Sequence, residues 1–469
     1  MERETRHPTF RFLAITLVLM VLIVLPFIWM GYGADADAWL VANAAKQLWQ
    51  TGVYSVSRFP GFPLHEILSA PLVALGGAPL SNSATVLAGL AAVVVWAFIV
   101  RRHARYPRLS LVSLAFTPLF LLNLPVTMDY VWSLLFVLLA LQASLRSKPV
   151  AAGILVGIAA GFRPANLAAI IPLMVMLRLG GLDSKTIQKC GVAAVVTTLV
   201  ALLPVFIRYG PVDWITDTFT EMSDVHPPVG KRVLAFGYRS LYALGPLATL
   251  TAIALFAVRR VVLVRSVRLR DPIVIGSASG VAVYLALFFL LPLDRSYLLP
   301  AFPFLLLLVD SVATRSWYIV FAACLFNMLV MNPDIIAHDG PSSTLRPALR
   351  WGRTIESMQE RKDFLRNRQR IAGISLVGKA IVMTGSGVPF SFENNLTEPD
   401  SSAFWRGVGK PVFRSTLHTN VCFVESLEPA EMAYVRTGGY LVHCIESARQ
   451  RVERLTGFTL EDSEVIVIQ

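Results

Sequence analysis

Long runs of apolar residues recur along the first 331 residues of the chain. The first run, residues 12–30, contains no charged side chain, and as a helix it is long enough to cross about 30 Å of hydrocarbon. Its length favours an uncleaved spanning helix over a cleaved signal sequence. The whole pattern predicts about eleven membrane-spanning helices. The predicted spans are residues 12–30, 84–100, 109–122, 130–145, 150–162, 165–177, 192–207, 241–258, 273–291, 297–309 and 317–331.

The pattern changes after residue 331. Residues 332–469 contain no run long enough to span a membrane, and short strand-like runs alternate there with helical ones. A basic amphipathic helix over residues 345–370 is expected to join the two parts and to lie on lipid headgroups. The expected fold is an all-α polytopic membrane bundle over residues 1–331, followed by a small soluble α/β domain over residues 332–469. The domain's strands are expected at residues 380–384, 421–424, 440–445 and 464–468, and its helices at residues 429–436 and 447–455.

Composition and charge agree with a membrane protein. The chain is 55% hydrophobic and 15% charged, whereas soluble domains carry about 25% charged residues. Its 42 Lys and Arg exceed its 30 Asp and Glu and give a formal net charge of +12. On a soluble protein this surplus would suggest a nucleic-acid partner, but here most of it lies in short loops between apolar runs. We therefore expect membrane lipids, and no nucleic acid, as partners.

The distribution of the basic residues predicts an orientation. With the amino terminus in the cytoplasm, Lys and Arg concentrate in the inner loops, as the positive-inside rule requires. The main outer loops cover residues 31–80, 209–238 and 293–296 and carry fewer basic residues. We therefore expect a multi-pass protein of the plasma (inner) membrane whose catalytic cavity faces the outside, or periplasm. An odd number of spans places residues 332–469 on that face as well.

The first outer loop carries the most suggestive polar residues. Asp35 and Asp37 follow the first span directly, at the start of a short helix. Capping of that helix explains one aspartate well. It explains less easily two aspartates that are followed by Arg58, His65 and Glu66 in the same loop.

This loop resembles the GT-C superfamily of membrane glycosyltransferases, which includes protein O-mannosyltransferases and aminoarabinose transferases. The resemblance rests on the acidic residues, the aromatic Trp39, an Ala-rich helix, the Gly-x-Tyr at residues 52–54 and a Pro-rich stretch at residues 57–66. It implies inverting transfer of a sugar from a polyprenyl-phosphate donor to a lipid, glycan or protein acceptor. An acidic residue of the first outer loop would act as base on the acceptor hydroxyl or bind a divalent metal.

Two aspartates compete for the position of the catalytic residue. The spacing counted back from Gly52 favours Asp37 as the matching residue. The aromatic Trp39, which follows Asp35 by four residues, favours Asp35 instead. Members of the superfamily more often have adjacent acidic residues, so the Asp-Ala-Asp spacing departs from their pattern. Both residues remain candidates.

Three further residues are candidates for binding the acceptor or a metal. Asp129 precedes the span at residues 130–145, and the resemblance implies an acidic residue there. Its other interpretation is an N-cap for that span. His65 and Glu66 form a second candidate pair, for which the alternative is a solvated surface position.

Four residues are candidates for binding the donor phosphate. Arg163 lies between two short apolar segments, where a cation is costly; a guanidinium suits phosphate geometry, and bonding to backbone carbonyls or headgroups is the alternative. The segment with Arg295 and Tyr297 resembles an Arg-Tyr-Leu-Leu-Pro segment whose arginine approaches the lipid phosphate, although Ser296 is inserted here. Interfacial anchoring is its alternative. Arg58 is expected to hold the sugar-phosphate end.

Two other functional classes remain open. An O-antigen ligase or polymerase type of enzyme would depend on arginine and histidine in a large outer loop, and would not need the acidic first loop. A lipid or solute transporter would show polar residues near the middle of its spans and an internal duplication. The sequence shows neither of these two features.

Overall fold

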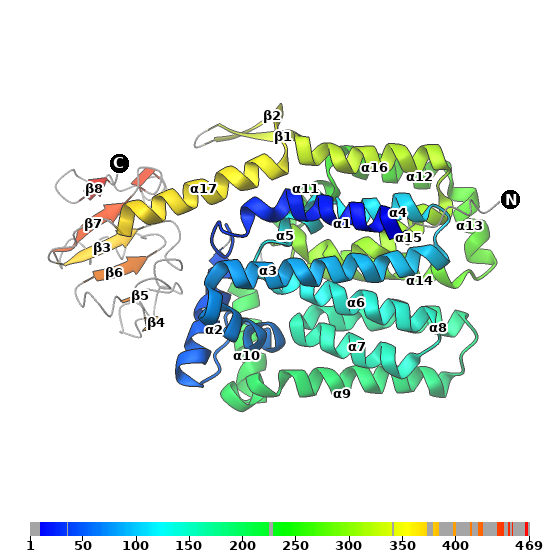
Figure 1. Ribbon diagram of the computed structural model, residues 1–469, viewed down its shortest axis with the longest axis horizontal. Helices are drawn as coiled ribbons and strands as arrows, with labels where there is room; N and C mark the ends of the chain where they lie inside the picture. Colours follow the sequence, from blue (N-terminus) through cyan, green and yellow to red (C-terminus); the bar gives the residue numbers. More distant parts are fainter. Residues whose placement is uncertain are drawn as a thin grey trace.

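The computed structural model contains a helical bundle, a β-hairpin, a long helix and a small sheet (Figure 1). It describes residues 10–34, 36–224, 228–339, 342–372, 379–383, 397–399, 413–414, 421–424, 439–444, 449–450, 453 and 465–467.

The bundle contains helices of very different length, from single turns to one of 41 residues. Its helices are α1 (Phe10–Val24), η1 (Leu25–Phe27), α2 (Ala36–Thr51), α3 (Pro63–His103), α4 (Pro107–Ala115), α5 (Pro118–Asn123), α6 (Asp129–Leu145), α7 (Pro149–Phe162), η2 (Pro164–Ala169), α8 (Ile170–Leu179), α9 (Ser184–Tyr209), α10 (Pro211–Asp224), α11 (Val229–Leu244), α12 (Pro246–Val258), α13 (Arg260–Arg268), α14 (Pro272–Leu290), η3 (Arg295–Ala301), α15 (Phe302–Val312) and α16 (Arg315–Val330).

The helical membrane bundle expected from the sequence is confirmed. By length and composition, five described helices can cross a membrane, or up to six if the pair α11–α12, bent by 94°, is one span. Four shorter apolar helices accompany them. Each span predicted from the sequence falls on one helix or on consecutive helices of the bundle.

The two ends of the bundle differ in charge. The described amino end lies at one end of the bundle, and α2, α10 and the carboxyl-terminal elements lie at the other (Figure 1). We call the first the basic end and the second the site end. The basic residues expected in inner loops belong to the basic end: Arg101, Arg102, Arg105, Arg108, Arg146, Lys148, Arg178, Lys185, Lys189, Arg259, Arg260, Arg265, Arg268, Arg270 and Arg315.

The long loop expected at residues 31–80 is mostly helical. It contains α2 and the first part of α3. At Gly77 the backbone of α3 leaves the helical region (φ 58°, ψ −150°), a conformation that glycine adopts at little cost. This break separates a short segment at the site end from the longer part of α3.

Close helix packing positions the end of α7. A Cβ added at Gly153 would lie 2.2 Å from the Cys190 carbonyl oxygen on α9. A Cβ added at Gly157 would lie 2.4 Å from Cβ of Thr197 on the same helix. Small residues at this spacing let two helix backbones approach closely. The contact fixes α7 along α9, and therefore fixes where Arg163 emerges after it.

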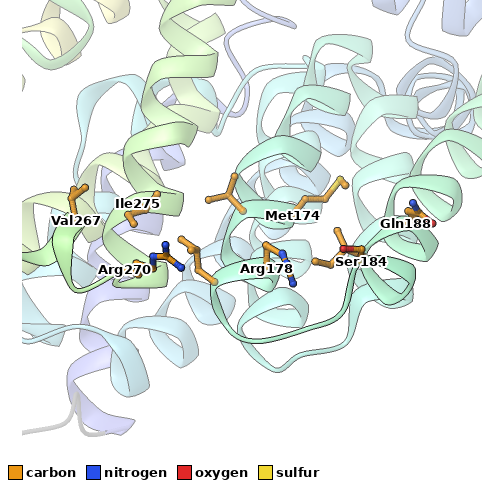
Figure 2. A pocket seen from close by; sticks show the side chains of 10 residues that line it. Met174, Arg178, Ser184, Gln188, Val267, Arg270 and Ile275 are labelled. Atoms are coloured by element: carbon orange, nitrogen blue, oxygen red, sulfur yellow. The ribbon is translucent and has the colours of Figure 1, made fainter.

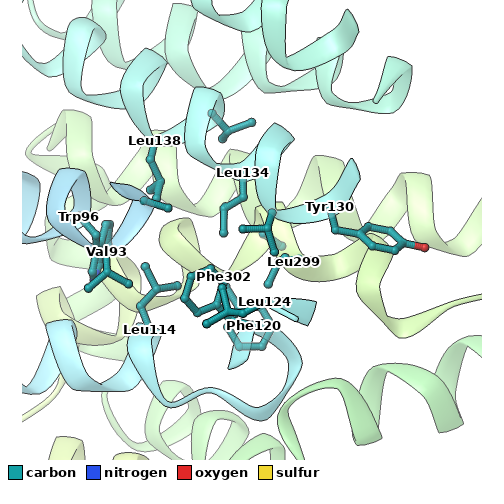
Figure 3. Close-up of a cluster of buried hydrophobic side chains, with 14 of the residues drawn as sticks. Val93, Trp96, Leu114, Phe120, Leu124, Tyr130, Leu134, Leu138, Leu299 and Phe302 are labelled. Atoms are coloured by element: carbon teal, nitrogen blue, oxygen red, sulfur yellow. The ribbon is translucent and has the colours of Figure 1, made fainter. Parts of the chain in front are cut away.

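The bundle core lies between α3, α4, α6 and α15. Figure 3 shows part of it, with Trp96, Leu114, Leu134 and Phe302 packed together, and all four are nearly or fully buried. Leu134 lies on the same helix as Tyr130, which reaches toward the site end (Figure 3). The core therefore holds the first turn of α6 in place.

The segment after the bundle differs from the expected amphipathic helix. Strands β1 (Met331–Asp339) and β2 (Ser342–Trp351) form an antiparallel hairpin in which Met331 pairs with Trp351. Helix α17 (Arg353–Ala372) begins only after it. The prediction of one helix over residues 345–370 was therefore wrong for its first part, where Pro347 cannot donate a helical hydrogen bond.

The remaining strands form a six-stranded sheet in the order β4-β5-β6-β3-β7-β8. The central strand β3 is parallel to β6 and β7, and β7 is parallel to β8. Four of these strands coincide with predicted ones, whereas the helix expected at residues 429–436 and most of that at 447–455 lie outside the described residues. The strands are β3 (Ala380–Met383), β4 (Thr397–Pro399), β5 (Phe413–Arg414), β6 (Val421–Val424), β7 (Leu441–Cys444) and β8 (Val465–Val467).

Candidate active site

Four of the charged residues singled out from the sequence meet at the site end. Nη2 of Arg58 donates to Oδ1 of Asp129 at 2.7 Å, and Nη1 of Arg163 donates to Oδ2 of the same carboxylate at 2.6 Å. Nε of Arg58 lies 3.3 Å from Oδ2 of Asp37. Asp37, Arg58, Asp129 and Arg163 therefore form a continuous series of ion pairs, which we call the ionic chain.

Asp37 is the most exposed member of the ionic chain. The side chains of Asp129, Arg163, Arg58 and Asp37 are 0%, 9%, 12% and 34% exposed. Burial by itself would lower the pKa of Arg58, but Asp129 and Asp37 outweigh it and raise that pKa above its ordinary value. The arginine therefore stays charged, and Asp37 is the member of the chain that a substrate can reach most easily.

Aromatic rings enclose the two guanidinium groups. The guanidinium carbon of Arg163 lies 4.3 Å from the ring centre of Tyr130 and 4.4 Å from that of Tyr297. That of Arg58 lies 4.1 Å from the ring centre of Phe62. Rings at these distances attract a cation and keep water away from it. The site is thus a rigid, charged cluster with aromatic walls.

Tyr130 extends the cluster to the turn before α15. Its hydroxyl donates to Oδ2 of Asp294 at 2.6 Å. The other carboxylate oxygen of Asp294 accepts from the Ser296 backbone N–H at 3.0 Å and thereby caps η3. Ser296, the residue inserted relative to the superfamily pattern, also accepts from Asn123 at 3.1 Å. The insertion therefore has a role in the local fold.

Asp37 is positioned by the start of α2. Trp39, two residues later, is buried, and its indole N–H donates to the Gly33 carbonyl at 3.0 Å. Its ring makes an edge-to-face contact with Tyr32 at 5.0 Å between centres. The aromatic that supported the resemblance thus fixes the loop before α2, while Asp35 lies outside the described residues.

A buried amide, which the sequence reasoning missed, ties two site-end loops together. Nδ2 of Asn82 donates to the carbonyls of Ile28 and Gly31 at 3.0 and 2.8 Å, and its Oδ1 accepts from Thr127 at 3.0 Å. The Thr127 backbone N–H also donates to the Tyr32 carbonyl at 2.9 Å. Within an apolar helix, a buried Asn is costly unless fully bonded. Asn82 beside an apolar run was therefore the sign in the sequence that a fully bonded amide is buried here.

His65 and Glu66 are not a solvated pair, contrary to that sequence-based alternative, because both are 1% exposed. The Glu66 carboxylate accepts from the Ser57 N–H at 2.7 Å, the Ser57 hydroxyl at 2.6 Å, the Phe62 N–H at 3.2 Å and the Tyr54 hydroxyl. Glu66 therefore organises the loop that carries Arg58. Nδ1 of His65 has no hydrogen-bond partner in the described part of the chain.

Two other sequence-based alternatives also fail. The N-cap of α6 is Met128, and Asp129 lies inside the helix in its first turn. The Arg163 guanidinium pairs with a carboxylate instead of with backbone carbonyls. Neither residue is explained by helix capping or by headgroup contact.

Arg295 lies apart from the ionic chain. It lines a cavity of about 100 Å³ together with Asn123, Asp294 and Arg353 of α17. Its neighbour Tyr297 instead packs on Arg163. The η3 turn thus directs Arg295 and Tyr297, which are two residues apart, to different places.

The described carboxylates of this site are paired with arginines. Within the described ranges, no three His, Cys, Asp or Glu residues are grouped closely enough to hold a metal ion. Both oxygens of Asp129 already accept from guanidinium groups, and Asp37 lies beside one of them. A cation placed here would face two fixed positive charges.

Helix α17 reaches the site end through one buried arginine. Arg361 is 2% exposed and donates to the Phe27 carbonyl at 3.1 Å and, through both terminal nitrogens, to the Pro125 carbonyl at 3.0 Å. Burial lowers the pKa of Arg361 to about 10. Phe27 is the last residue of η1, and Pro125 lies in the turn after α5, so Arg361 joins α17 to two separate segments of the bundle.

Comparison with known proteins gives one likeness in fold. No protein-family model matches the sequence, and no curated protein matches it. Among solved structures, the fold is similar to the crystal structure of ArnT from Cupriavidus metallidurans bound to undecaprenyl phosphate. The two are 16% identical with a TM-score of 0.45, over 64% of this chain and 59% of the other. At this identity the likeness concerns the fold alone.

Proposed function

We propose that this protein is a membrane glycosyltransferase that moves a sugar from a polyprenyl-phosphate donor to a hydroxyl of a lipid, glycan or protein acceptor. The observation that carries the proposal is the ionic chain, which leads from the buried Asp129 to the partly exposed Asp37. Charges buried at the end of a membrane bundle are costly and mark functional sites.

Asp37 is the proposed general base. It is the most exposed carboxylate of the ionic chain, and Nε of Arg58 lies 3.3 Å from one of its oxygens. In the reaction, the acceptor oxygen forms a bond to the anomeric carbon while the bond from that carbon to the phosphate oxygen breaks. The polyprenyl phosphate leaves with the electron pair, the acceptor proton passes to Asp37, and the anomeric configuration inverts.

Arg58 is the proposed contact for the leaving phosphate. Its Nη1 is buried and has no hydrogen-bond partner among the described residues, although its Nη2 is bonded to Asp129. A buried guanidinium nitrogen without an acceptor is unfavourable, and a phosphate oxygen would satisfy it with a charge-assisted bond. Arg163, held between Tyr130 and Tyr297, would then orient Asp129 and stabilise the site from behind.

The proposed reaction takes place on the outer face of the plasma membrane. The basic end collects the arginines of the short loops, and the positive-inside rule assigns such an end to the cytoplasm. The ionic chain lies at the opposite end. A polyprenyl-phosphate headgroup in the outer leaflet would meet the site at this level.

Turnover of defined donors tests the proposal. The purified protein is offered a panel of polyprenyl-phosphate sugars with a membrane extract as acceptor, and released polyprenyl phosphate is measured. Asp37→Asn should lower turnover at least about a hundredfold, as expected for loss of a general base. Asp183→Asn is the matched control, since this exposed N-cap of α9 lies at the basic end and Asn caps equally well.

Two results would contradict the proposal. Full activity of Asp37→Asn would remove Asp37 as the base, and an Asp35→Asn variant then tests the other aspartate. Absence of turnover with every donor, from a monodisperse wild-type protein, would reject glycosyl transfer from a polyprenyl phosphate.

A further inference from the structure

A groove opens at the basic end, far from the ionic chain. It lies between α8 and α9 on one side and the α13–α14 junction on the other, with a volume of about 620 Å³ (Figure 2). Volumes of this size accommodate ligands larger than a single ion. We call it the basic-end groove.

The groove combines apolar walls with two arginines. Met174 and Ile275 contribute apolar surface, and Arg178 and Arg270 come from opposite walls (Figure 2). This is the combination that a molecule with an anionic head and an apolar tail would require.

No carboxylate among the described residues neutralises either arginine. Arg178 donates to the Leu182 carbonyl at 3.2 Å, and neither arginine forms an ion pair within the described part of the chain. The two nearest aspartates in sequence serve as helix caps. Asp183 accepts from the Thr186 N–H, and Asp271 accepts from backbone N–H groups at the start of α14. Both positive charges therefore remain available to a ligand.

Helix α13 places the groove at the level of lipid headgroups. None of its residues is buried. It carries the exposed Val267 and, on the other side of the helix, Arg265 and Arg268. Such a helix lies in the membrane interface, with its apolar side in the acyl region and its arginines among the headgroups. The groove begins at the end of this helix.

We propose that the basic-end groove binds one anionic glycerophospholipid, with its phosphate on Arg178 and Arg270 and its acyl chains along the apolar walls. Charge complementarity selects an anionic head, because two unpaired arginines at an interface attract one. The proposal is independent of the glycosyltransferase function.

Native mass spectrometry of the full chain in detergent tests this site. Phosphatidylglycerol is titrated against phosphatidylcholine, and the fraction with one bound lipid is measured. The wild type should retain one phosphatidylglycerol, and Arg178→Gln/Arg270→Gln should weaken it at least tenfold, as expected for loss of charge-assisted bonds. Arg265→Gln/Arg268→Gln is the matched control, since it removes the same charge from exposed positions of α13 outside the groove.

A second variant covers the case in which the double variant does not fold. Ile275→Trp narrows the groove with a larger side chain and keeps both arginines, so it should also weaken retention of phosphatidylglycerol. Equal retention of phosphatidylcholine would show that the groove does not select an anionic head. Equal weakening in the α13 control would show nonspecific electrostatic attraction. Either result would overturn the proposal. Undiminished binding by Ile275→Trp would overturn it as well.

Discussion

Asp129 is the centre of the candidate site. It is fully buried, and each of its oxygens accepts from a different arginine. Removal of one partner from a buried ion pair leaves an uncompensated charge, which costs more than the pair itself contributes. The ionic chain is therefore a cooperative unit in which loss of one member disturbs the others.

The first prediction concerns the stability of this unit. Asp129→Asn leaves Arg58 and Arg163 without their shared carboxylate, and we expect it to lower the free energy of unfolding by about 3–5 kcal/mol. Thermal unfolding in detergent measures the change, and Asp271→Asn, which keeps an N-cap on α14, serves as control. An unchanged unfolding midpoint for Asp129→Asn would contradict the role of Asp129 as the carboxylate that holds both arginines.

For single residues, the four members of the ionic chain could be identified from the sequence, but the ion pairs between them could not. Arg163 was singled out because a cation between apolar segments is costly. Asp37, Arg58 and Asp129 were singled out by their places in outer loops and by the resemblance. Their mutual contacts depend on packing between helices that are distant in the chain, which no local pattern encodes. Glu66 was misjudged for the same reason, because its burial depends on how the preceding loop folds over it.

Among the elements, α17 is the one that joins the carboxyl-terminal part to the bundle. It follows the β1–β2 hairpin, and its Arg361 bonds to two carbonyls at the site end. One of these carbonyls, at Pro125, precedes Asp129 by a few residues. The docking of α17 therefore bears on the geometry of the ionic chain.

The second prediction tests this docking. Arg361→Met removes three charge-assisted hydrogen bonds, each worth about 1.5–3 kcal/mol, and should release α17 from the bundle. Hydrogen exchange of α17 should then become faster than in the wild type. Arg366→Met, on the exposed side of the same helix, should leave exchange near the wild-type rate. Equal rates in both variants would contradict a docking role for Arg361.

The membrane-spanning helices could be predicted from the sequence, whereas the β1–β2 hairpin could not. Apolar runs such as residues 273–291 determine a membrane helix because lipid leaves the backbone no partners outside the helix itself. Strand β2 depends on pairing with β1, a tertiary contact, so the charged pattern of residues 345–351 was misread as helical. Pro347 was the one local sign against that interpretation.

The whole molecule has a charge polarity, with a basic end and a site end. The same polarity underlies both proposals: glycosyl transfer at one end and binding of an anionic lipid at the other. Both depend on which end faces the cytoplasm.

The third prediction concerns this orientation. A cysteine at Thr51, exposed at the end of α2, should react with a membrane-impermeant maleimide in intact cells. A cysteine at Lys185, exposed at the basic end, should react only after the membrane is opened. The unsubstituted chain, with its four native cysteines, gives the background. The reverse labelling pattern would place the ionic chain in the cytoplasm and reject the proposed outer site.

The central claim is that Asp37 removes the acceptor proton, and chemical rescue tests it most directly. Asp37→Ala leaves space for a small external carboxylate, so added formate should restore part of the lost release of polyprenyl phosphate, because it supplies the missing base. Formate should not restore Asp129→Ala, whose partners are buried arginines. Rescue of the first variant alone is the predicted result. Equal turnover of Asp37→Ala and wild type, or no rescue by formate at any concentration, would contradict the assignment of Asp37 as the base.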